Sequence, residues 1–195
     1  AGIVTNLRPA DQLRKRQCVG QPFPATLVEI RRDDGSRCDA DEVGELFSTS
    51  PYLFNGYWGK PEATAEAWRD GWVTVGDLAL RDAEGHIYIV DRKKDMVISG
   101  GVNIYPREIE EVLAQHPDIA EAAVVGVPDE KWGERLKAFV VLRPGSALGA
   151  EAVVEFCAGR ISRMKTPREV AFIERIPRNA NGKVLKTLLR ERAAR

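Results

Sequence analysis

The spacing of hydrophobic and polar positions changes near the middle of the chain. Before about Val90, apolar residues tend to alternate with polar ones between turn-forming segments, which is typical of strands. After that point, segments with helical spacing alternate with short apolar runs. We therefore expect an α+β chain in two parts, with a strand-rich domain over residues 1–91 and a smaller α+β domain over residues 92–195.

The first part is predicted to consist mainly of β-hairpins. The expected strands are Thr26–Ile30, Val43–Thr49, Leu78–Arg81 and His86–Val90. Two turns rich in Asp and Gly, Asp33–Ser36 and Asp82–Gly85, join these strands in pairs. A short helix is expected over Pro61–Trp68, because proline suits the first turn and Glu62 lies near the positive end of the helix dipole.

The second part is predicted to be a small sheet flanked by helices. The expected strands are Ala122–Val127, Ala138–Leu142 and Val170–Ile173. The expected helices are Pro106–Gln115, Glu151–Ile161 and Val184–Arg192. The helix side chains expected to face inward are Ile109, Val112, Leu113, Val153, Val154, Cys157, Ile161, Leu185, Leu188 and Leu189. This pattern predicts a short three-stranded sheet with helices beside it.

Composition narrows the possible partners. The 195 residues carry 29 basic and 29 acidic side chains, so the chain lacks the basic excess that nucleic acids or anionic membranes usually require. No apolar run is long enough to cross a bilayer. The three cysteines, Cys18, Cys38 and Cys157, are widely spaced and lie in no metal-binding motif. We therefore expect no disulfide framework, no metal site and a cytoplasmic protein, while nothing indicates an oligomeric state.

A basic loop near the end of the chain, Ile176–Lys186, places Lys183 directly after a glycine. The simplest interpretation is a solvated lysine that opens a helix. A cation at the start of a helix is mildly unfavourable, so helix stability does not account for it. The alternative is that the loop brings this charge to an anion whose charge grows during a reaction. Two unit charges ~4 Å apart attract by ~4 kcal/mol at an effective dielectric constant of about 20.

Three further segments admit both a structural and a functional interpretation. Asp77 follows a glycine and could cap its own turn, or its carboxylate could accept both hydroxyls of a ribose. The charged run Asp91–Asp95 could be an interdomain linker, or it could supply a hinge and an arginine that binds ribose or phosphate. The glycines of Ser99–Gly101 fit a tight turn or the close approach of a ligand equally well.

Trp132 lies in a loop expected between two strands. A tryptophan in a loop usually covers the core, but it can also stack on a nucleobase. Arg163, Lys165 and Arg168 crowd a segment that is either solvated surface or a site for the phosphates of a bulky cofactor.

The order of six motifs is much more specific than any of these residues alone. The motifs are G-E-L-F, F-N-G-Y-W-G-K-P-E-A-T-A-E-A, D-G-W-V-T-V-G-D-L, D-R-K-K-D-M-V-I-S-G-G-V-N-I-Y-P-R-E-I-E, V-G-V-P-D-E-K-W-G-E and P-R-N-A-N-G-K-V-L-K. This order resembles the adenylate-forming acyl-CoA synthetases, the fatty-acyl and aryl-CoA ligases related to luciferase and to peptide-synthetase adenylation domains. The resemblance covers nearly the whole chain.

The resemblance implies the strand-rich tail of a large N-terminal AMP-binding domain followed by a small C-terminal lid domain. It also implies two half-reactions. A carboxylate attacks the α-phosphate of ATP, bound with Mg²⁺, and gives acyl-AMP and pyrophosphate. The lid then rotates, and the thiol of coenzyme A displaces AMP to give a thioester. The implied small-molecule partners are therefore a carboxylic acid, ATP and coenzyme A.

The matching motifs imply roles for individual residues. Asp77 would hold the ribose hydroxyls of ATP or AMP with help from Arg92, and Lys183 would meet the reacting carboxylate and α-phosphate. Lys94 aligns with the hinge between the two conformations. The residues implied to contact coenzyme A are Gly101, Trp132, Lys165 and Arg168.

Two departures from the family pattern limit what this chain is expected to do by itself. Val75 stands where a threonine usually precedes Gly-Asp, and Thr74 lies one place earlier, so a hydroxyl contact near the nucleotide is in question. The family's phosphate loop and acyl pocket belong upstream of this sequence, and no G-x-x-x-x-G-K-[ST] loop replaces them. We therefore expect a fragment that is inactive alone. The alternative functions are an adenylation domain that loads a carrier protein and a non-catalytic, lid-like binding module.

Overall fold

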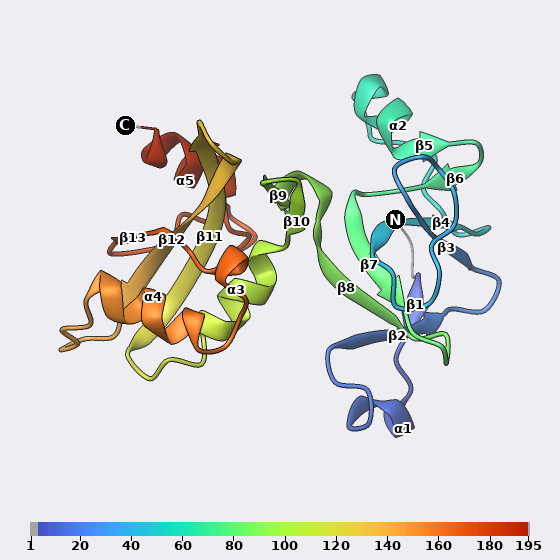
Figure 1. Ribbon diagram of the computed structural model, residues 1–195. Helices are drawn as coiled ribbons and strands as arrows, with labels where there is room; N and C mark the ends of the chain where they lie inside the picture. The colour runs from blue at the N-terminus through green and yellow to red at the C-terminus, as the bar shows by residue number, and fades with distance from the viewer. Residues whose placement is uncertain (1–3, 195) are drawn as a thin grey trace. The chain divides into compact units, whose positions relative to one another are not determined.

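The computed structural model describes residues 4–194 and divides into two compact units, which we call unit 1, up to Lys94, and unit 2, from Asp95 onward. Unit 1 is rich in strands and unit 2 mixes helices with strands, so the expected α+β class is confirmed (Figure 1). The division falls after Lys94, whereas the domains expected from the sequence were residues 1–91 and 92–195. The outermost residues of those ranges, 1–3 and 195, lie outside the described part.

Unit 1 is built on an eight-stranded sheet within the described residues up to Lys94. Its strands are β1 (Thr5–Asn6), β2 (Cys18–Pro22), β3 (Leu27–Arg31), β4 (Gly44–Thr49), β5 (Trp68–Arg69), β6 (Trp72–Val73), β7 (Asp77–Arg81) and β8 (Ile87–Arg92). The strand order is β1-β2-β8-β7-β4-β6-β5, with β3 paired to β4. The two helices of this unit are α1 (Pro9–Gln12) and α2 (Pro61–Ala67). The buried core residues are Val28, Ile30, Leu46, Ala79 and Ile87.

The hairpins predicted in unit 1 are confirmed. β3 pairs antiparallel with β4, and β7 pairs antiparallel with β8. The predicted helix is α2, but it ends at Ala67 rather than at Trp68. Trp68 has an extended backbone, with φ −98° and ψ 127°, and it pairs with Val73 across β5 and β6. Strand pairing therefore ends the helix one residue earlier than local propensity suggests.

Unit 2 contains a five-stranded sheet and three α-helices within residues 95–194. Its strands are β9 (Val97–Ser99), β10 (Val102–Ile104), β11 (Ile119–Asp129), β12 (Gly133–Leu142) and β13 (Glu169–Phe172). Its α-helices are α3 (Pro106–Leu113), α4 (Ala150–Ala158) and α5 (Lys186–Ala193). The 3₁₀ helices are η1 (Lys93–Asp95), which begins in unit 1, and η2 (Arg163–Lys165). The strand order is β10-β9-β12-β11, and β13 runs parallel to β12.

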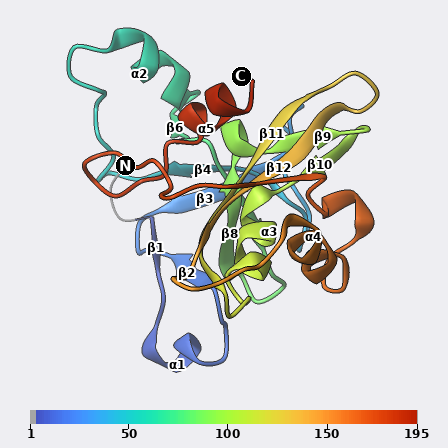
Figure 2. The ribbon, with the colours of Figure 1, turned by 90° about the vertical axis from the view of Figure 1, so that its left-hand side faces the viewer.

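The two long strands β11 and β12 form a ribbon that is buried on both faces. Val124, Ala138 and Val140 face one core, which also contains buried residues of α3 and α4. The alternate side chains, such as Val125 and Phe139, face a second core that contains a buried leucine of α5. Figure 2 shows α5 on one side of the ribbon and α3 and α4 on the other. Because side chains of a strand alternate between faces, a ribbon covered on both sides is apolar almost throughout its middle.

The sheet of unit 2 is wider than the predicted three-stranded sheet. All three predicted strands are present, but β11 and β12 extend further at their ends. β9 and β10 are additional strands that form a hairpin, and β9 reaches β12 where Ser99 lies opposite Gly133. Glycines are poor strand formers, which is why the sequence did not predict this hairpin. In the structure Gly100 and Gly101 form only its turn.

Helix α5 differs from the prediction in its start and in one buried position. It begins at Lys186 rather than at Val184, because Val184 is still paired with Arg178 in an isolated β-bridge. Leu189 is fully buried, as predicted. Leu188 is 41% exposed, so the prediction that it faces inward is wrong. With 3.6 residues per turn, neighbouring residues project about 100° apart, and only one of the two can point directly at the ribbon.

The substitution Leu189→Ala is expected to destabilise unit 2, because it leaves a cavity in the core beneath α5. The expected loss in the free energy of unfolding is ~2–5 kcal/mol. Leu188→Ala is the matched control and should change the free energy of unfolding by less than ~1 kcal/mol. Urea unfolding followed by circular dichroism measures both values. Equal losses would mean that α5 packs on the ribbon in a different rotation.

Candidate functional site

The strand register of unit 1 brings Asp77 and Arg92 together. Asp77 begins β7, Arg92 ends β8, and the two residues lie opposite each other in the register. Arg92 Nε lies 3.3 Å from Asp77 Oδ1, and both side chains are partly exposed. A partly exposed ion pair adds little to stability, so both groups can be redirected to a ligand at small cost. The pairing is compatible with the predicted joint contact to a ribose, which stays a prediction.

Asp77 also lines a small apolar hollow of about 210 Å³ in unit 1, together with Val75 and Ile89. Val75 is 40% exposed here. Thr74 is buried, and its Oγ1 donates a hydrogen bond to Glu45 Oε1 at 2.8 Å. The hydroxyl of Thr74 therefore serves the interior of unit 1, and it does not replace the hydroxyl that the family pattern usually has at the position of Val75.

Lys94 lies between two residues that are each anchored in their own unit. In unit 1, the Nζ of Lys93 lies 3.0 Å from Glu45 Oε2. In unit 2, the Oδ1 of Asp95 lies 3.3 Å from Arg190 Nη2, and Asp95 is 9% exposed. Lys94 itself is exposed and is the last residue of unit 1. A hinge needs a few residues at the ends of elements that can absorb backbone rotation, and Lys94 has such a position.

Lys183 lies in a tight turn between β13 and α5. The turn is closed by the bridge between Arg178 and Val184, by a hydrogen bond from Asn179 N to Lys183 O at 2.9 Å, and by one from Gly182 N to Asn179 O at 2.9 Å. Gly182 has φ +78°, a backbone conformation that favours glycine. Lys183 is exposed and lies outside α5, so the simpler interpretation of a lysine that opens a helix is wrong.

Gly100 and Gly101 form the turn of the β9–β10 hairpin, with φ values of +58° and +79°. Positive φ at both central residues is the signature of a tight hairpin turn. A Cβ on Gly100 would lie 2.7 Å from Cε3 of Trp132, whereas a Cβ on Gly101 would meet nothing within 4 Å. The two glycines therefore form a tight turn, and the close approach of a ligand stays a prediction. The close approach at Gly100 comes from a tryptophan of the same unit.

Trp132 lies in the β11–β12 turn and belongs to neither core of unit 2. Its backbone carbonyl accepts a hydrogen bond from Gly100 N at 2.9 Å. The guanidinium carbon of Arg168 lies 5.1 Å from the centroid of the indole ring, and the Nζ of Lys131 lies 5.0 Å from it. Cations at this distance from an indole are attracted by its π-electrons. The half-buried ring and its two cations can therefore receive a flat or anionic ligand.

Lys165 is engaged elsewhere in unit 2. Its Nζ lies 2.7 Å from Oε2 of Glu108, in the first turn of α3. The structure thus brings Trp132 and Arg168 together, while Lys165 is paired with a carboxylate. A contact between Lys165 and coenzyme A requires that this ion pair open.

The turns that contain Lys183 and Trp132 lie near opposite ends of the β11–β12 ribbon. Arg178, at the base of the Lys183 turn, lies 2.6 Å from Glu121 near the start of β11. Trp132 lies three residues after Asp129, which is the other end of β11. At ~3.4 Å per residue, the strand from Glu121 to Asp129 is about 27 Å long. One rigid ribbon therefore holds the two candidate groups far apart.

Sequence reasoning missed the side chains that shape the Lys183 turn. Oδ1 of Asn179 accepts hydrogen bonds from the backbone N of Asn181 at 3.0 Å and of Lys183 at 2.9 Å. The signal was present in the sequence, because an Asn that begins a short segment ending in glycine is typical of such side-chain-capped turns. The partner of Arg178, Glu121, could not be found in this way, since 57 positions separate the two residues.

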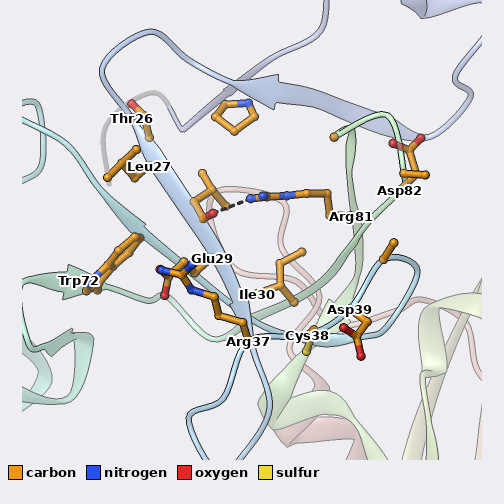
Figure 3. A pocket seen from close by; sticks show the side chains of 15 residues that line it. Thr26, Leu27, Glu29, Ile30, Arg37, Cys38, Asp39, Trp72, Arg81 and Asp82 are labelled. Atoms are coloured by element: carbon orange, nitrogen blue, oxygen red, sulfur yellow. Dashed lines mark hydrogen bonds and ion pairs between the residues drawn. The ribbon is translucent and has the colours of Figure 1, made fainter.

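A second hollow of unit 1, larger than the one beside Asp77, contains none of the predicted site residues. It has a volume of about 680 Å³ and lies beside β3 and the end of β7 (Figure 3). Arg81 enters it and donates a hydrogen bond to the carbonyl of Val28, while Arg37 is paired with Glu29 at its rim. Asp82, which also lines the hollow, is paired with Lys15 outside it. Size alone does not make this hollow the functional site.

Metal binding and thiol chemistry each place requirements on the side chains of residues 4–194. No group of three or more His, Cys, Asp or Glu side chains there is arranged to hold a metal ion. Burial raises the pKa of the Cys157 thiol to about 11, so this thiol is protonated at neutral pH and is a poor nucleophile. None of the helices in this part of the chain has the length and apolar character of a membrane span.

Comparison with known proteins identifies the family. Residues 108–183 match the family described as AMP-binding enzyme C-terminal domain. Over 187 residues the chain is 46% identical to the long-chain-fatty-acid–CoA ligase FadD13 of Mycobacterium tuberculosis. The aligned part is 96% of this chain and 37% of the relative. The chain is also 44% identical over 193 residues to the indoleacetate–CoA ligase of Aromatoleum aromaticum. That alignment includes 99% of this chain and 38% of the relative. The chain thus spans less than two-fifths of the length of these relatives.

Solved structures lead to the same family. The o-succinylbenzoate CoA synthetase MenE from Bacillus subtilis, in complex with the acyl-adenylate intermediate OSB-AMP, superposes with a TM-score of 0.89 at 36% identity, over 95% of this chain and 38% of that one. The same enzyme with ATP and a magnesium ion gives a TM-score of 0.87 at 35% identity. Residues 108–183 therefore belong to the AMP-binding enzyme C-terminal domain family, and nearly the whole chain is similar to adenylate-forming enzymes. The curated relatives it matches within that family are acyl-CoA and aryl-CoA ligases.

Gly100→Ala is expected to displace the indole of Trp132, because the new Cβ would lie 2.7 Å from the ring. Gly101→Ala is the matched control, since it has the same positive-φ strain but opens into free space. The fluorescence of Trp132, obtained as the difference from a Trp132→Phe background, should change in the first variant only. Equal changes in both variants would attribute the effect to backbone strain in the turn.

Proposed function

We propose that this chain supplies the ribose-binding and lid parts of an ATP-dependent acyl-CoA synthetase. In the first half-reaction, a carboxylate and ATP, bound with Mg²⁺, give acyl-AMP and pyrophosphate. In the second, coenzyme A displaces AMP and gives a thioester. The observation that carries the proposal is the separation of the Lys183 turn from the Gly101–Trp132 region along one ribbon. Family membership and the names of the matched CoA ligases support the reaction class.

Asp77 and Arg92 are assigned to the ribose of ATP and AMP. A carboxylate with two oxygens matches the two adjacent hydroxyls of a ribose, and the neighbouring guanidinium is a rigid donor that keeps the carboxylate oriented. Their ion pair at 3.3 Å holds both groups in place before the nucleotide arrives.

Lys183 is assigned to the adenylation step. Negative charge builds up on the α-phosphate oxygens as the carboxylate attacks, and a lysine that arrives with the lid stabilises that charge. The exposed turn lets the ammonium reach a nucleotide held elsewhere. The Mg²⁺ of the substrate supplies further charge neutralisation when it is bound with ATP, and the residues of this chain assigned to the nucleotide are Asp77, Arg92 and Lys183.

The thioester step is assigned to the other end of the ribbon. Gly101, which has free space beside its Cα, is assigned to the passage for the pantetheine thiol. Trp132 and Arg168 offer a ring and a cation to the nucleotide end of coenzyme A. Lys165 is also assigned to coenzyme A, and in this role it exchanges Glu108 for a phosphate.

Lys94 is assigned to the hinge that exchanges these two ends. Its flanking residues, Lys93 and Asp95, are each tied to their own unit, so rotation concentrates at the residue between them. The carboxylic acid substrate is not assigned further, because none of the residues assigned above is proposed to contact its acyl part. A cytoplasmic location is proposed from the three free cysteines, which suit a reducing compartment.

Lys183→Ala in the full-length enzyme is expected to reduce pyrophosphate release by at least a hundredfold, because the charge that stabilises the attack is lost. Thioester formation from supplied acyl-AMP should stay within about twofold of the parent. Lys60→Ala, which removes an exposed lysine of unit 1, is the control and should leave both steps unchanged. Equal losses in the two half-reactions would contradict the assignment of Lys183 to adenylation.

Gly101→Leu is expected to have the reverse effect, because a bulky side chain would block the thiol passage. Thioester formation should fall by at least tenfold, and pyrophosphate release should be retained. Gly101→Ala has the same backbone strain with little added bulk and is the matched control. Rapid-quench measurement of each half-reaction separates the outcomes. Normal use of coenzyme A by the leucine variant would refute the role of Gly101.

A further inference from the structure

We propose that Arg178 and Asn179 are positioning residues that hold the Lys183 turn in its reactive shape, and that Glu121 anchors Arg178 to the ribbon. The inference rests on the proposed role of Lys183 in adenylation and extends it to residues that no motif match assigned. All of the contacts involved lie within unit 2.

Arg178 joins the Lys183 turn to the sheet. Its Nη1 donates a hydrogen bond to the carbonyl of Gly182 at 2.8 Å, and its Nη2 donates to Oε2 of Glu121 at 2.6 Å. Gly182 directly precedes Lys183, and Glu121 lies near the start of β11. The planar fork of the guanidinium can make both contacts at once, whereas the single ammonium of a lysine holds no such fixed geometry. The backbone beside Lys183 is thereby tied to a rigid strand.

Asn179 fixes the turn from inside. Its Oδ1 accepts from the backbone N of Asn181 at 3.0 Å and from the backbone N of Lys183 at 2.9 Å. Its own backbone N donates to Lys183 O at 2.9 Å. Both main-chain polar groups of Lys183 are therefore bonded to the same asparagine. The Cα of the reactive residue cannot move without breaking one of these bonds.

These contacts fix geometry more than they stabilise the fold. The side chains of Arg178 and Glu121 are 44% and 45% exposed, and ion pairs at such positions contribute little to the free energy of unfolding. Small errors in position are nevertheless costly to a reaction, since a displacement of about 1 Å can reduce the rate by about a hundredfold. A lysine side chain is long and flexible, so a fixed backbone limits where its ammonium can reach.

Arg175 provides a matched control. It lies three positions before Arg178, is exposed, and lines the same shallow hollow beside α5. Among the described residues it makes no hydrogen bond or ion pair. Its removal therefore changes the local charge as much as the removal of Arg178 does, without loosening the Lys183 turn.

The experiment compares Arg178→Ala, Asn179→Ala and Arg175→Ala in the full-length enzyme. We expect pyrophosphate release to fall ten- to a hundredfold in the first two variants, with thioester formation from supplied acyl-AMP within about twofold of the parent. Arg175→Ala should stay within about twofold in both steps, and all melting temperatures should agree within a few degrees. Glu121→Gln should weaken adenylation in the parent but add nothing in the Arg178→Ala background, because the two residues act through one contact.

A second readout does not depend on activity. Amide hydrogen exchange at Lys183 and Asn181 should speed up at least tenfold in Asn179→Ala, and Asn179→Asp should restore protection because it keeps the acceptor oxygen. Unchanged exchange in Asn179→Ala, or adenylation in Arg178→Ala equal to that in Arg175→Ala, overturns the inference. If Lys183→Ala leaves adenylation intact, the proposed function fails as well. If adenylation is lost in Lys183→Ala but retained in Arg178→Ala and Asn179→Ala, only the positioning role fails.

Discussion

The β11–β12 ribbon is the constraint on which unit 2 depends. Its alternate side chains enter two separate cores, so α3 and α4 are fixed to one face and α5 to the other. Such a ribbon cannot slip by one residue without mispacking both cores, because every side chain would move from one core into the other. Its register therefore also fixes the two turns to which we assign chemistry. The rigid sheet therefore keeps Lys183 and Trp132 at a fixed separation.

A rigid body with two functional ends can present only one of them to a single small site at a time. The proposed assignment of the two ends to two half-reactions therefore requires this unit to rotate, and we propose that one residue between two anchored neighbours permits it. Lys93 and Asp95 are held by side chains of their own units, and Lys94 is the exposed residue between them. In the proposed mechanism, such a rotation also withdraws the charge of Lys183 after adenylation.

Exposure distinguishes the groups proposed for function from those that stabilise the fold. The buried polar pair of Thr74 and Glu45 serves the interior of unit 1. The pairs between Asp77 and Arg92 and between Glu121 and Arg178 are both partly exposed. They add little to stability, so their value lies in orientation.

The sequence by itself determined the hairpins of unit 1, the positions of most helices, the α+β class and the family, because these follow from local spacing and from motifs that are contiguous in the chain. It also indicated Lys183, Asp77 and Arg92, which stand within such motifs. Only the tertiary structure decided that Leu188 is exposed, that β9 and β10 join the sheet, that Trp132 packs on Gly100 and that Glu121 anchors Arg178. Each of these depends on contacts between residues distant in the sequence or on the rotation of one element against another. Local spacing does not fix those contacts, because they form only when the separate segments pack together.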